Sequence, residues 1–223
     1  MTVPKKNSDK QKNDFYSPEE VKKLLEAVED DRMKPVVYLG LVGLRRSEML
    51  ALTWNDVDFA NCTINVDKNL VVINGKMSIG RCKTRSSVRK ITVPKSVMNK
   101  LAECRQSQQL EKMAQIGKYQ DNGLVVCKLN GSYIIPASLS SMFPTMLKKY
   151  GLRKIRIHDL RHTYCTLGIN YYNIPATVIA KQAGHSSPRV TMDSYSHANE
   201  ELQRESSDIF EDRLFGDINQ KLG

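Results

Sequence analysis

The strongest constraint on the fold is a change of periodicity in the middle of the chain. Before Trp54 and after Pro94 apolar residues recur at helical spacing, whereas the stretch between them consists of short segments rich in β-branched residues. These segments predict strands over 63–66, 70–73, 77–80 and 88–93. Asn74-Gly75 is a typical hairpin turn. We therefore expect an α+β protein, mainly α-helical, with a small antiparallel β-sheet of about three strands.

Helices are predicted on both sides of this sheet. The clearest start is Ser17-Pro18-Glu19-Glu20, where serine is the N-cap, proline is the first helical residue and Glu20 completes a capping box. The expected helices span about 17–28, 33–42, 46–52, 96–116, 137–150, 158–171, 175–183 and 188–198, with a further short strand over 124–127.

The chain divides into three parts by composition. Residues 1–14 are polar and lysine-rich, which is typical of a linker or flexible arm. Residues 15–200 carry the periodic segments and form one folded domain. The tail over 201–223 carries scattered apolar side chains, which suit either a neighbouring protomer or packing on its own domain.

Composition limits the partners and the compartment. The 223 residues include 34 Lys and Arg against 24 Asp and Glu, a net charge of +10. That balance favours nucleic acid first and an anionic membrane surface second, although a merely basic protein is the alternative. Five cysteines without a C-x-x-C pair argue against a disulfide framework and favour reduced thiols in a cytoplasm. The longest apolar run, 36–44, is too short to span a bilayer, and the polar first residues lead us to expect no secretory signal.

The first chemical motif is Gly43-Leu44-Arg45-Arg46-Ser47-Glu48. Arg45 falls where one helix ends and the next begins. Its planar guanidinium can contact two non-bridging phosphate oxygens, and Glu48, one turn later, can orient it. The alternative is a surface arginine on an amphipathic helix.

Lys83 lies in a turn of the predicted sheet, between Arg81 and Arg89. A lysine at a hairpin tip can reach into a groove as a movable proton donor. A solvated turn lysine is the alternative.

His158 and Arg161 open a predicted helix and share one face at a spacing of i and i+3. His158 and His162 also have the i, i+4 spacing of zinc ligands. We weigh zinc lower, because Arg161 beside them repels a cation and no glutamate occupies the base position. A capping or buried histidine is the further alternative.

Gly184-His185 precedes Tyr195 by a loop and a short helical segment. A tyrosine hydroxyl can act as a nucleophile, although a packing tyrosine is the ordinary interpretation of one such residue.

Together these motifs resemble the catalytic signature of the tyrosine recombinases, the phage-integrase family. The first motif fits G-L-R-x-x-E-x-x-x-L through Gly43, Leu44, Arg45, Glu48 and Leu52. Lys83-Thr84 with Ser87 and Arg89 is similar to the hairpin lysine of the family, and His158 to Arg161 matches H-x-x-R. The histidine of the G-H step and a tyrosine ten residues later complete the pattern.

The resemblance implies a tyrosine recombinase catalytic-domain fold over 15–200 and a site-specific DNA recombinase, or integrase, that acts on double-stranded DNA. Its implied catalytic residues are Arg45, Lys83, His158, Arg161, His185 and the nucleophile Tyr195, with Lys83 as general acid. Arg85 and Arg89 are then DNA phosphate contacts or simple strand charges.

The family further implies a 3′-phosphotyrosyl intermediate without ATP, metal or another cofactor, and tetramers assembled on DNA. The same resemblance implies integration or excision of a mobile element, with accessory DNA-bending or excision factors. A cytoplasmic location and no membrane partner are expected from the cysteine usage and the short apolar runs. Full integrases carry a core-binding domain before the catalytic one, whereas this chain has only the lysine-rich stretch there. We therefore expect weak, salt-sensitive DNA binding.

Three other functions remain open. A type IB topoisomerase shares the chemistry but reseals the same strand. A non-catalytic DNA-binding protein could keep the fold, and a metallohydrolase could use His158 and His162.

Overall fold

The structure is a computed structural model that describes residues 14–73, 76–82 and 87–185. Lys83, Arg85 and Tyr195 lie outside the described residues, as do most of the predicted arm, the turn at 74–75, the expected helix over 188–198 and the tail.

The predicted helices that fall within the described residues are confirmed to within a few residues at their ends. They are α1 (Pro18–Ala27), α2 (Lys34–Leu41), α3 (Arg46–Ala51), α4 (Lys95–Ala114), α5 (Pro136–Lys149), α6 (Ile157–Asn170) and α7 (Ala176–Ala183), with a 3-10 turn over Trp54–Asp56. The capping box of α1 is present: the Glu20 amide donates to Ser17 Oγ at 3.2 Å, and the Ser17 amide donates to Glu20 Oε2 at 2.9 Å. A local sequence signal therefore sets the start of α1.

The strands form two separate antiparallel units. A three-stranded sheet has the order β1-β2-β5, from β1 (Val57–Asp58), β2 (Thr63–Val66) and β5 (Arg89–Thr92). A two-stranded ribbon pairs β3 (Lys68–Ile73) with β4 (Lys76–Arg81). The fold class is confirmed, and the strands expected in one sheet are divided between two.

The strand predicted over 124–127 is wrong. Its backbone pairs at a single bridge, between Thr53 and Leu124, and the Val125 amide donates to the Leu52 carbonyl at 2.9 Å. All four residues are buried, so they lack the alternation of a half-buried strand. Their β-branched composition reflects burial against the core rather than a ladder.

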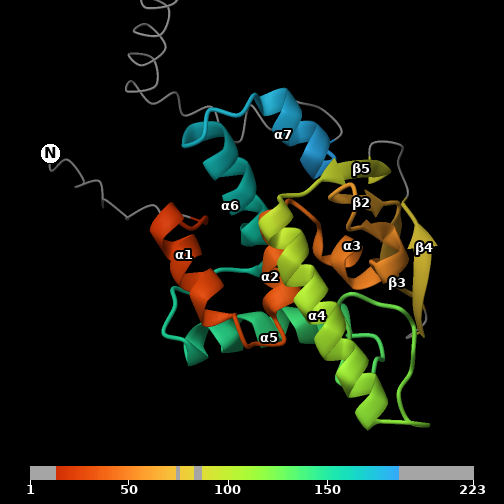
Figure 1. Cartoon of the computed structure of the whole chain (residues 1–223). Helices are drawn as coiled ribbons and strands as arrows, with labels where there is room; N and C mark the ends of the chain where they lie inside the picture. Colours follow the sequence, from red (N-terminus) through yellow and green to blue (C-terminus); the bar gives the residue numbers. More distant parts are fainter. Residues whose placement is uncertain (1–13, 74–75, 83–86, 186–223) are drawn as a thin grey trace, which may run out of the picture.

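The end of α2, the first turn of α6 and the last turn of α7 lie close together in the fold (Figure 1). Helix α2 packs against α6, and α7 packs against both α6 and β5. Leu39 near the end of α2, Leu44 in the α2–α3 junction and Leu160 at the start of α6 are at most 1% exposed in the common core. This packing sets the first turn of α6 beside the α2–α3 junction and the last turn of α7.

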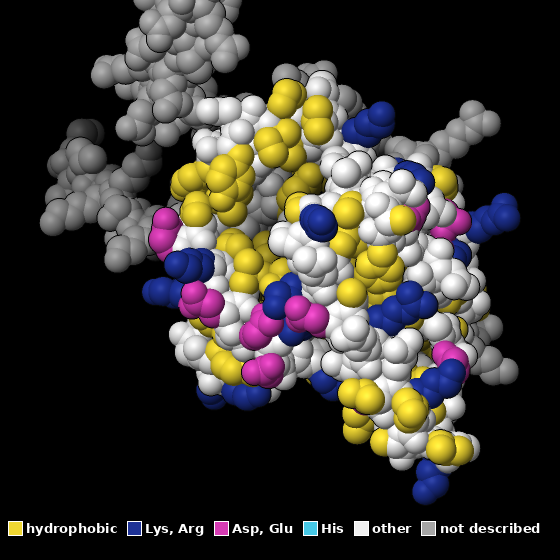
Figure 2. Space-filling view, viewed as in Figure 1, with side chains coloured by type: hydrophobic (Ala, Val, Ile, Leu, Met, Phe, Trp, Pro, Cys, Tyr) yellow, Lys and Arg dark blue, Asp and Glu magenta, His cyan; other side chains and the backbone are white. Residues whose placement is uncertain are grey.

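Apolar side chains also reach the surface in a few places. Leu110 and Met113 lie on the C-terminal half of α4, and Ile116 lies just after it; they are 68%, 69% and 87% exposed. Figure 2 shows apolar side chains gathered there. Elsewhere on this face lysines and arginines are interspersed with acidic side chains (Figure 2). The helices of the described residues include none with the length and hydropathy needed to cross a membrane.

Candidate active site

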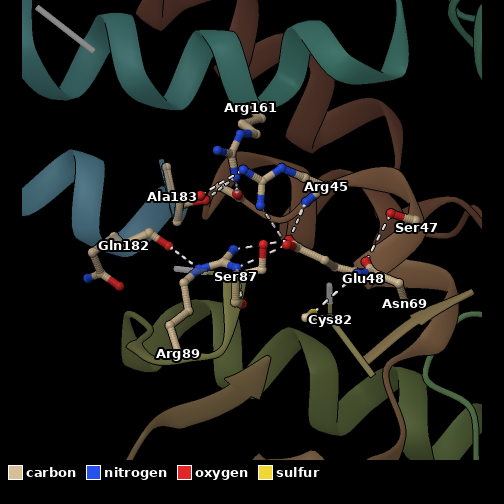
Figure 3. A network of polar contacts seen from close by, with 12 residues as sticks. Arg45, Ser47, Glu48, Asn69, Cys82, Ser87, Arg89, Arg161, Gln182 and Ala183 are labelled. Carbon is tan, nitrogen blue, oxygen red and sulfur yellow. Dashed lines mark hydrogen bonds and ion pairs between the residues drawn. The ribbon is translucent and has the colours of Figure 1, made fainter. Parts of the chain in front are cut away.

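Three arginines from three different elements converge on the last turn of α7 (Figure 3). Arg89 Nε on β5 donates to the Gln182 carbonyl at 2.7 Å, and Arg45 Nη2 at the start of α3 donates to the Gly184 carbonyl at 2.7 Å. Arg161 Nη1 on α6 donates to the Ala183 carbonyl between them. The last carbonyls of a helix have no partner within it and carry the negative end of the helix dipole. The end of α7 is therefore an acceptor group for the cations of the site.

The glycines of the first and last motifs end their helices in the same way. Gly43 follows α2 with φ +93°, and Gly184 follows α7 with φ +70°. In each case the next residue donates its amide back to a carbonyl five residues earlier, Leu44 to Leu39 at 3.1 Å and His185 to Ala180 at 3.0 Å. This is the Schellman ending that glycine favours.

Arg161 joins these two helix ends. Its Nη1 donates to the Gly43 carbonyl at 2.5 Å as well as to the Ala183 carbonyl. The residue is 3% exposed. Burial first, and then the charge of Arg45, lowers the pKa of Arg161 to about 10, so the guanidinium is still charged at neutral pH.

The carboxylate of Glu48 is a second acceptor of hydrogen bonds from the arginines. The residue is 2% exposed, and its carboxylate accepts from the Arg45 amide at 2.7 Å and from Arg45 Nη1 at 2.9 Å. It also accepts from Arg89 Nη1 and Nη2, both at 3.0 Å. Burial raises the pKa of Glu48, but the hydrogen bonds and charge of Arg89, followed by those of Arg45, outweigh it and leave the pKa below its ordinary value. The expectation that Glu48 orients Arg45 is confirmed by these contacts.

The two histidines of the motifs lie in the field of these arginines. His158, at the start of α6, is exposed, yet desolvation of its ring and the charge of Arg161 lower its pKa. His185 is half-buried, and desolvation followed by the charges of Arg161 and Arg45 lowers its pKa to about 4. Both rings are therefore neutral near pH 7, each with one N–H donor and one acceptor nitrogen.

The structure brings Arg45, His158, Arg161 and His185 together, as the motifs predicted. It also brings in Arg89, whose side chain is 6% exposed and directed at Glu48 and Gln182 rather than at solvent. The roles of these residues, including the DNA contacts assigned to Arg85 and Arg89, stay predictions.

The carbonyls of α7 are the part of the site that sequence reasoning missed. The one sequence signal for them is the glycine at 184, which marks a helix end without indicating what binds there.

The chemistry of this cluster suits a phosphodiester. Guanidinium groups bind phosphate oxygens through directed, charge-assisted hydrogen bonds, and preorganised donors stabilise charge that develops in a transition state. Arg45 is the more accessible of the two motif arginines, because 34% of its side chain is exposed, whereas Arg161 is 3% exposed.

The zinc interpretation of His158 and His162 gains no support. The ring of His162 meets Phe15 edge-on, with centroids 5.9 Å apart, whereas His158 lies near Arg161. Within the described part of the chain, no group of three or more His, Cys, Asp or Glu side chains is arranged to hold a metal ion.

Comparison with known proteins gives the family. The model of the phage integrase family matches residues 14–201. The chain belongs to the phage integrase family.

Two relatives show how much of such proteins the chain represents. It is 28% identical over 208 residues to the ICEBs1 integrase of Bacillus subtilis strain 168, covering 92% of this chain and 56% of the relative. It is 30% identical over 195 residues to a tyrosine recombinase XerC-like protein of Caldanaerobacter subterraneus, covering 82% and 50%. The chain thus spans about half the length of the curated relatives it matches.

Solved structures show the same fold. The Tn1549 transposon integrase in complex with transposon right end DNA has a TM-score of 0.73 at 25% identity, over 93% of this chain and 68% of that one. The XerA recombinase has a TM-score of 0.67 at 24% identity, over 86% and 63%.

Proposed function

We propose that the chain is the catalytic part of a site-specific DNA recombinase that breaks and rejoins double-stranded DNA through Tyr195. The observation that carries this proposal is the convergence of Arg45 and Arg161 with the neutral rings of His158 and His185. Such a set can hold a phosphodiester and stabilise its transition state by hydrogen bonding and charge. The relatives named integrase and tyrosine recombinase, and the DNA complex of the Tn1549 integrase, support the same class.

In the proposed reaction, the phenolic oxygen of Tyr195 forms a bond to phosphorus while the bond from phosphorus to the 5′ oxygen breaks. The products are a 3′-phosphotyrosyl link and a strand with a 5′-hydroxyl. The phenol has an ordinary pKa near 10, so it must lose its proton during attack. His158 accepts that proton as base or relay, for which its lowered pKa keeps the ring neutral. Lys83 gives a proton to the departing 5′ oxygen.

The 5′-hydroxyl of a partner strand then reverses the step, so strands are exchanged with no net loss of bonds. The phosphotyrosyl link conserves the energy of the phosphodiester, and the mechanism therefore needs no ATP. The guanidinium groups of Arg45 and Arg161, with the N–H of His185, stabilise the charge on the pentacoordinate phosphorus.

The wider setting is part of the proposal. The recombinase acts in the cytoplasm as a tetramer on DNA, integrating or excising a mobile element, with accessory DNA-bending or excision factors. Residues 1–14 serve as an arm before the catalytic domain over 15–200. The tail over 201–223 docks on a neighbouring protomer, with packing on its own domain as the alternative.

A covalent trapping assay tests the proposal. The chain is incubated in EDTA and low salt with a pool of nicked duplexes of randomised core sequence, and protein-linked strands are recovered under denaturing conditions and sequenced. We expect an adduct with the wild type and none with Tyr195→Phe. Tyr172→Phe is the matched control, because Tyr172 is 60% exposed at the end of α6 and should leave the adduct intact.

The outcomes separate the competing functions. An adduct that persists in Tyr195→Phe rejects Tyr195 as the nucleophile. Strand exchange between two enriched sites identifies a recombinase, whereas resealing of the same strand alone identifies a topoisomerase-like enzyme. Binding without an adduct, also in a version extended to the length of the relatives, identifies a non-catalytic DNA-binding protein.

A further inference from the structure

Arg89 is enclosed by protein on the side of the site away from solvent. Its side chain is 6% exposed, and its donors reach the Gln182 carbonyl, both oxygens of Glu48 and the Ser87 carbonyl at 3.2 Å. A guanidinium has five N–H groups, and four of them are accounted for by these bonds. This arrangement suits a residue that holds others in place better than one that contacts DNA.

One line of contact runs from Arg89 to Arg45. Arg89 Nη1 and Nη2 bind Glu48 Oε1 and Oε2 in a fork, and the same two oxygens accept from Arg45 Nη1 and the Arg45 amide. A bidentate guanidinium–carboxylate pair fixes the plane of the carboxylate. The orientation of the Arg45 guanidinium therefore depends on Arg89 through Glu48 (Figure 3).

A second line runs from Arg89 to His185. Arg89 Nε binds the Gln182 carbonyl in the last turn of α7, and a Cβ built on Gly184 would lie 2.9 Å from Arg89 Nη1. The Arg89 side chain thus lies against the backbone that leads directly into His185. It fixes the position from which the His185 ring projects.

We propose that Arg89 is a positioning residue of the active site, which holds Arg45 through Glu48 and His185 through the last turn of α7. The inference rests on the proposed function for its catalytic consequence. Arg89→Lys keeps the charge but cannot bind Glu48 in a fork and reach Gln182 together. Arg89→Gln removes the charge as well. The loss of preorganisation should therefore increase from Arg89→Lys to Arg89→Gln.

The first test is the rate of adduct formation under single-turnover conditions at saturating DNA. We expect Arg89→Lys to lower the rate about 10-fold and Arg89→Gln about 100-fold, the size of loss that a misplaced catalytic group produces. Lys90→Gln is the matched control, because Lys90 is exposed on the same strand and should keep the wild-type rate. A wild-type rate in Arg89→Lys and Arg89→Gln overturns the inference.

The second test separates positioning from a phosphate contact. The slope of log affinity against log salt falls by about one when a protein loses a single phosphate contact. We expect the slope of Arg89→Lys and Arg89→Gln to equal that of the wild type. A slope lowered by about one in Arg89→Gln overturns the inference and restores the phosphate contact.

The third test needs neither DNA nor activity. The ring resonances of His185 are followed by NMR in isotope-labelled protein without DNA and assigned with His185→Gln. We expect them to shift in Arg89→Lys, which retains the charge, and to stay unchanged in Lys90→Gln. Unshifted resonances in a folded Arg89→Lys overturn the inference. If neither the wild-type chain nor the version extended to the length of the relatives forms an adduct, the proposed function is rejected instead, and the NMR result then decides the inference by itself.

Discussion

Gly184 lies directly against the guanidinium of Arg89, so that a Cβ on Gly184 would meet Arg89 Nη1 at 2.9 Å and Cζ at 3.0 Å. The same glycine has φ +70°, in the left-handed region that side chains disfavour. Two independent constraints therefore act on this one position, the turn that ends α7 and the close approach of β5.

Gly184→Ala should be more destabilising than the backbone conformation alone explains. Gly151 is the matched control, because its φ is +67° and a Cβ there would meet nothing within 4 Å. Gly151→Ala should cost about 1 kcal/mol in the free energy of unfolding. Gly184→Ala should cost a further 1–3 kcal/mol, roughly the penalty of overpacking, and should slow adduct formation. Urea unfolding of both variants measures the difference, and equal losses would show that Arg89 moves aside without cost.

Arg161→Gln should affect both stability and chemistry. The substitution leaves the buried carbonyls of Gly43 and Ala183 without the guanidinium donor of Arg161. We expect this to lower the free energy of unfolding by on the order of 1–3 kcal/mol. Removal of a donor to the transition state should lower the cleavage rate by roughly 100-fold or more. Arg46→Gln is the control, since Arg46 is exposed beside Arg45 and contacts Ser140 at the surface. Single-turnover cleavage by Arg161→Gln at the rate of Arg46→Gln would contradict the proposed role.

Glu48→Gln should destabilise the protein by about 3–5 kcal/mol, the cost of breaking a buried ion pair by removing one partner. The side chains of Glu48 and Arg89 are 1% and 6% exposed, so solvent replaces little of the lost interaction. Glu26→Gln on the exposed face of α1 should stay within about 0.5 kcal/mol of the wild type. Chemical unfolding at pH 7 measures both, and a difference below 1 kcal/mol between the variants would argue against the pairing.

The stability of the protein should fall in mild acid, partly because of His185. Its pKa is about 4 in the folded protein, below the ordinary value of 6.5. Between these values the unfolded chain binds the proton more readily, so the free energy of unfolding decreases as the pH falls from 6.5 to 4. His185→Gln should show a shallower decrease over this window in urea unfolding. A pH dependence identical to that of the wild type would mean that the ring is not held neutral.

Much of the fold and part of the site follow from local sequence signals. The capping box at Ser17 and the glycines at 43 and 184 mark helix ends that the structure reproduces. Arg45 with Glu48, and His158 with Arg161, are pairs three residues apart, so helical geometry alone brings each pair together.

What the sequence could not predict depends on contacts between distant segments. Arg89 pairs with Glu48 across 41 positions and with Gln182 across 93, and no local pattern encodes either contact. An amino-acid sequence distinguishes side chains and not backbone carbonyls. It therefore does not predict that the last turn of α7 accepts hydrogen bonds from the three arginines. The division of the strands into two units depends on which edges pair, whereas β-branched composition indicates only that strands exist.

The last turn of α7 makes three arginines of the site depend on one short helix. A helix of eight residues is marginal by itself, and its end is bound by arginines from α3, β5 and α6. When α7 opens locally, those guanidinium groups lose their common acceptors at the same moment. Amide hydrogen exchange in this turn should therefore report the free energy that separates the competent site from a dismantled one, even while the rest of the core stays folded.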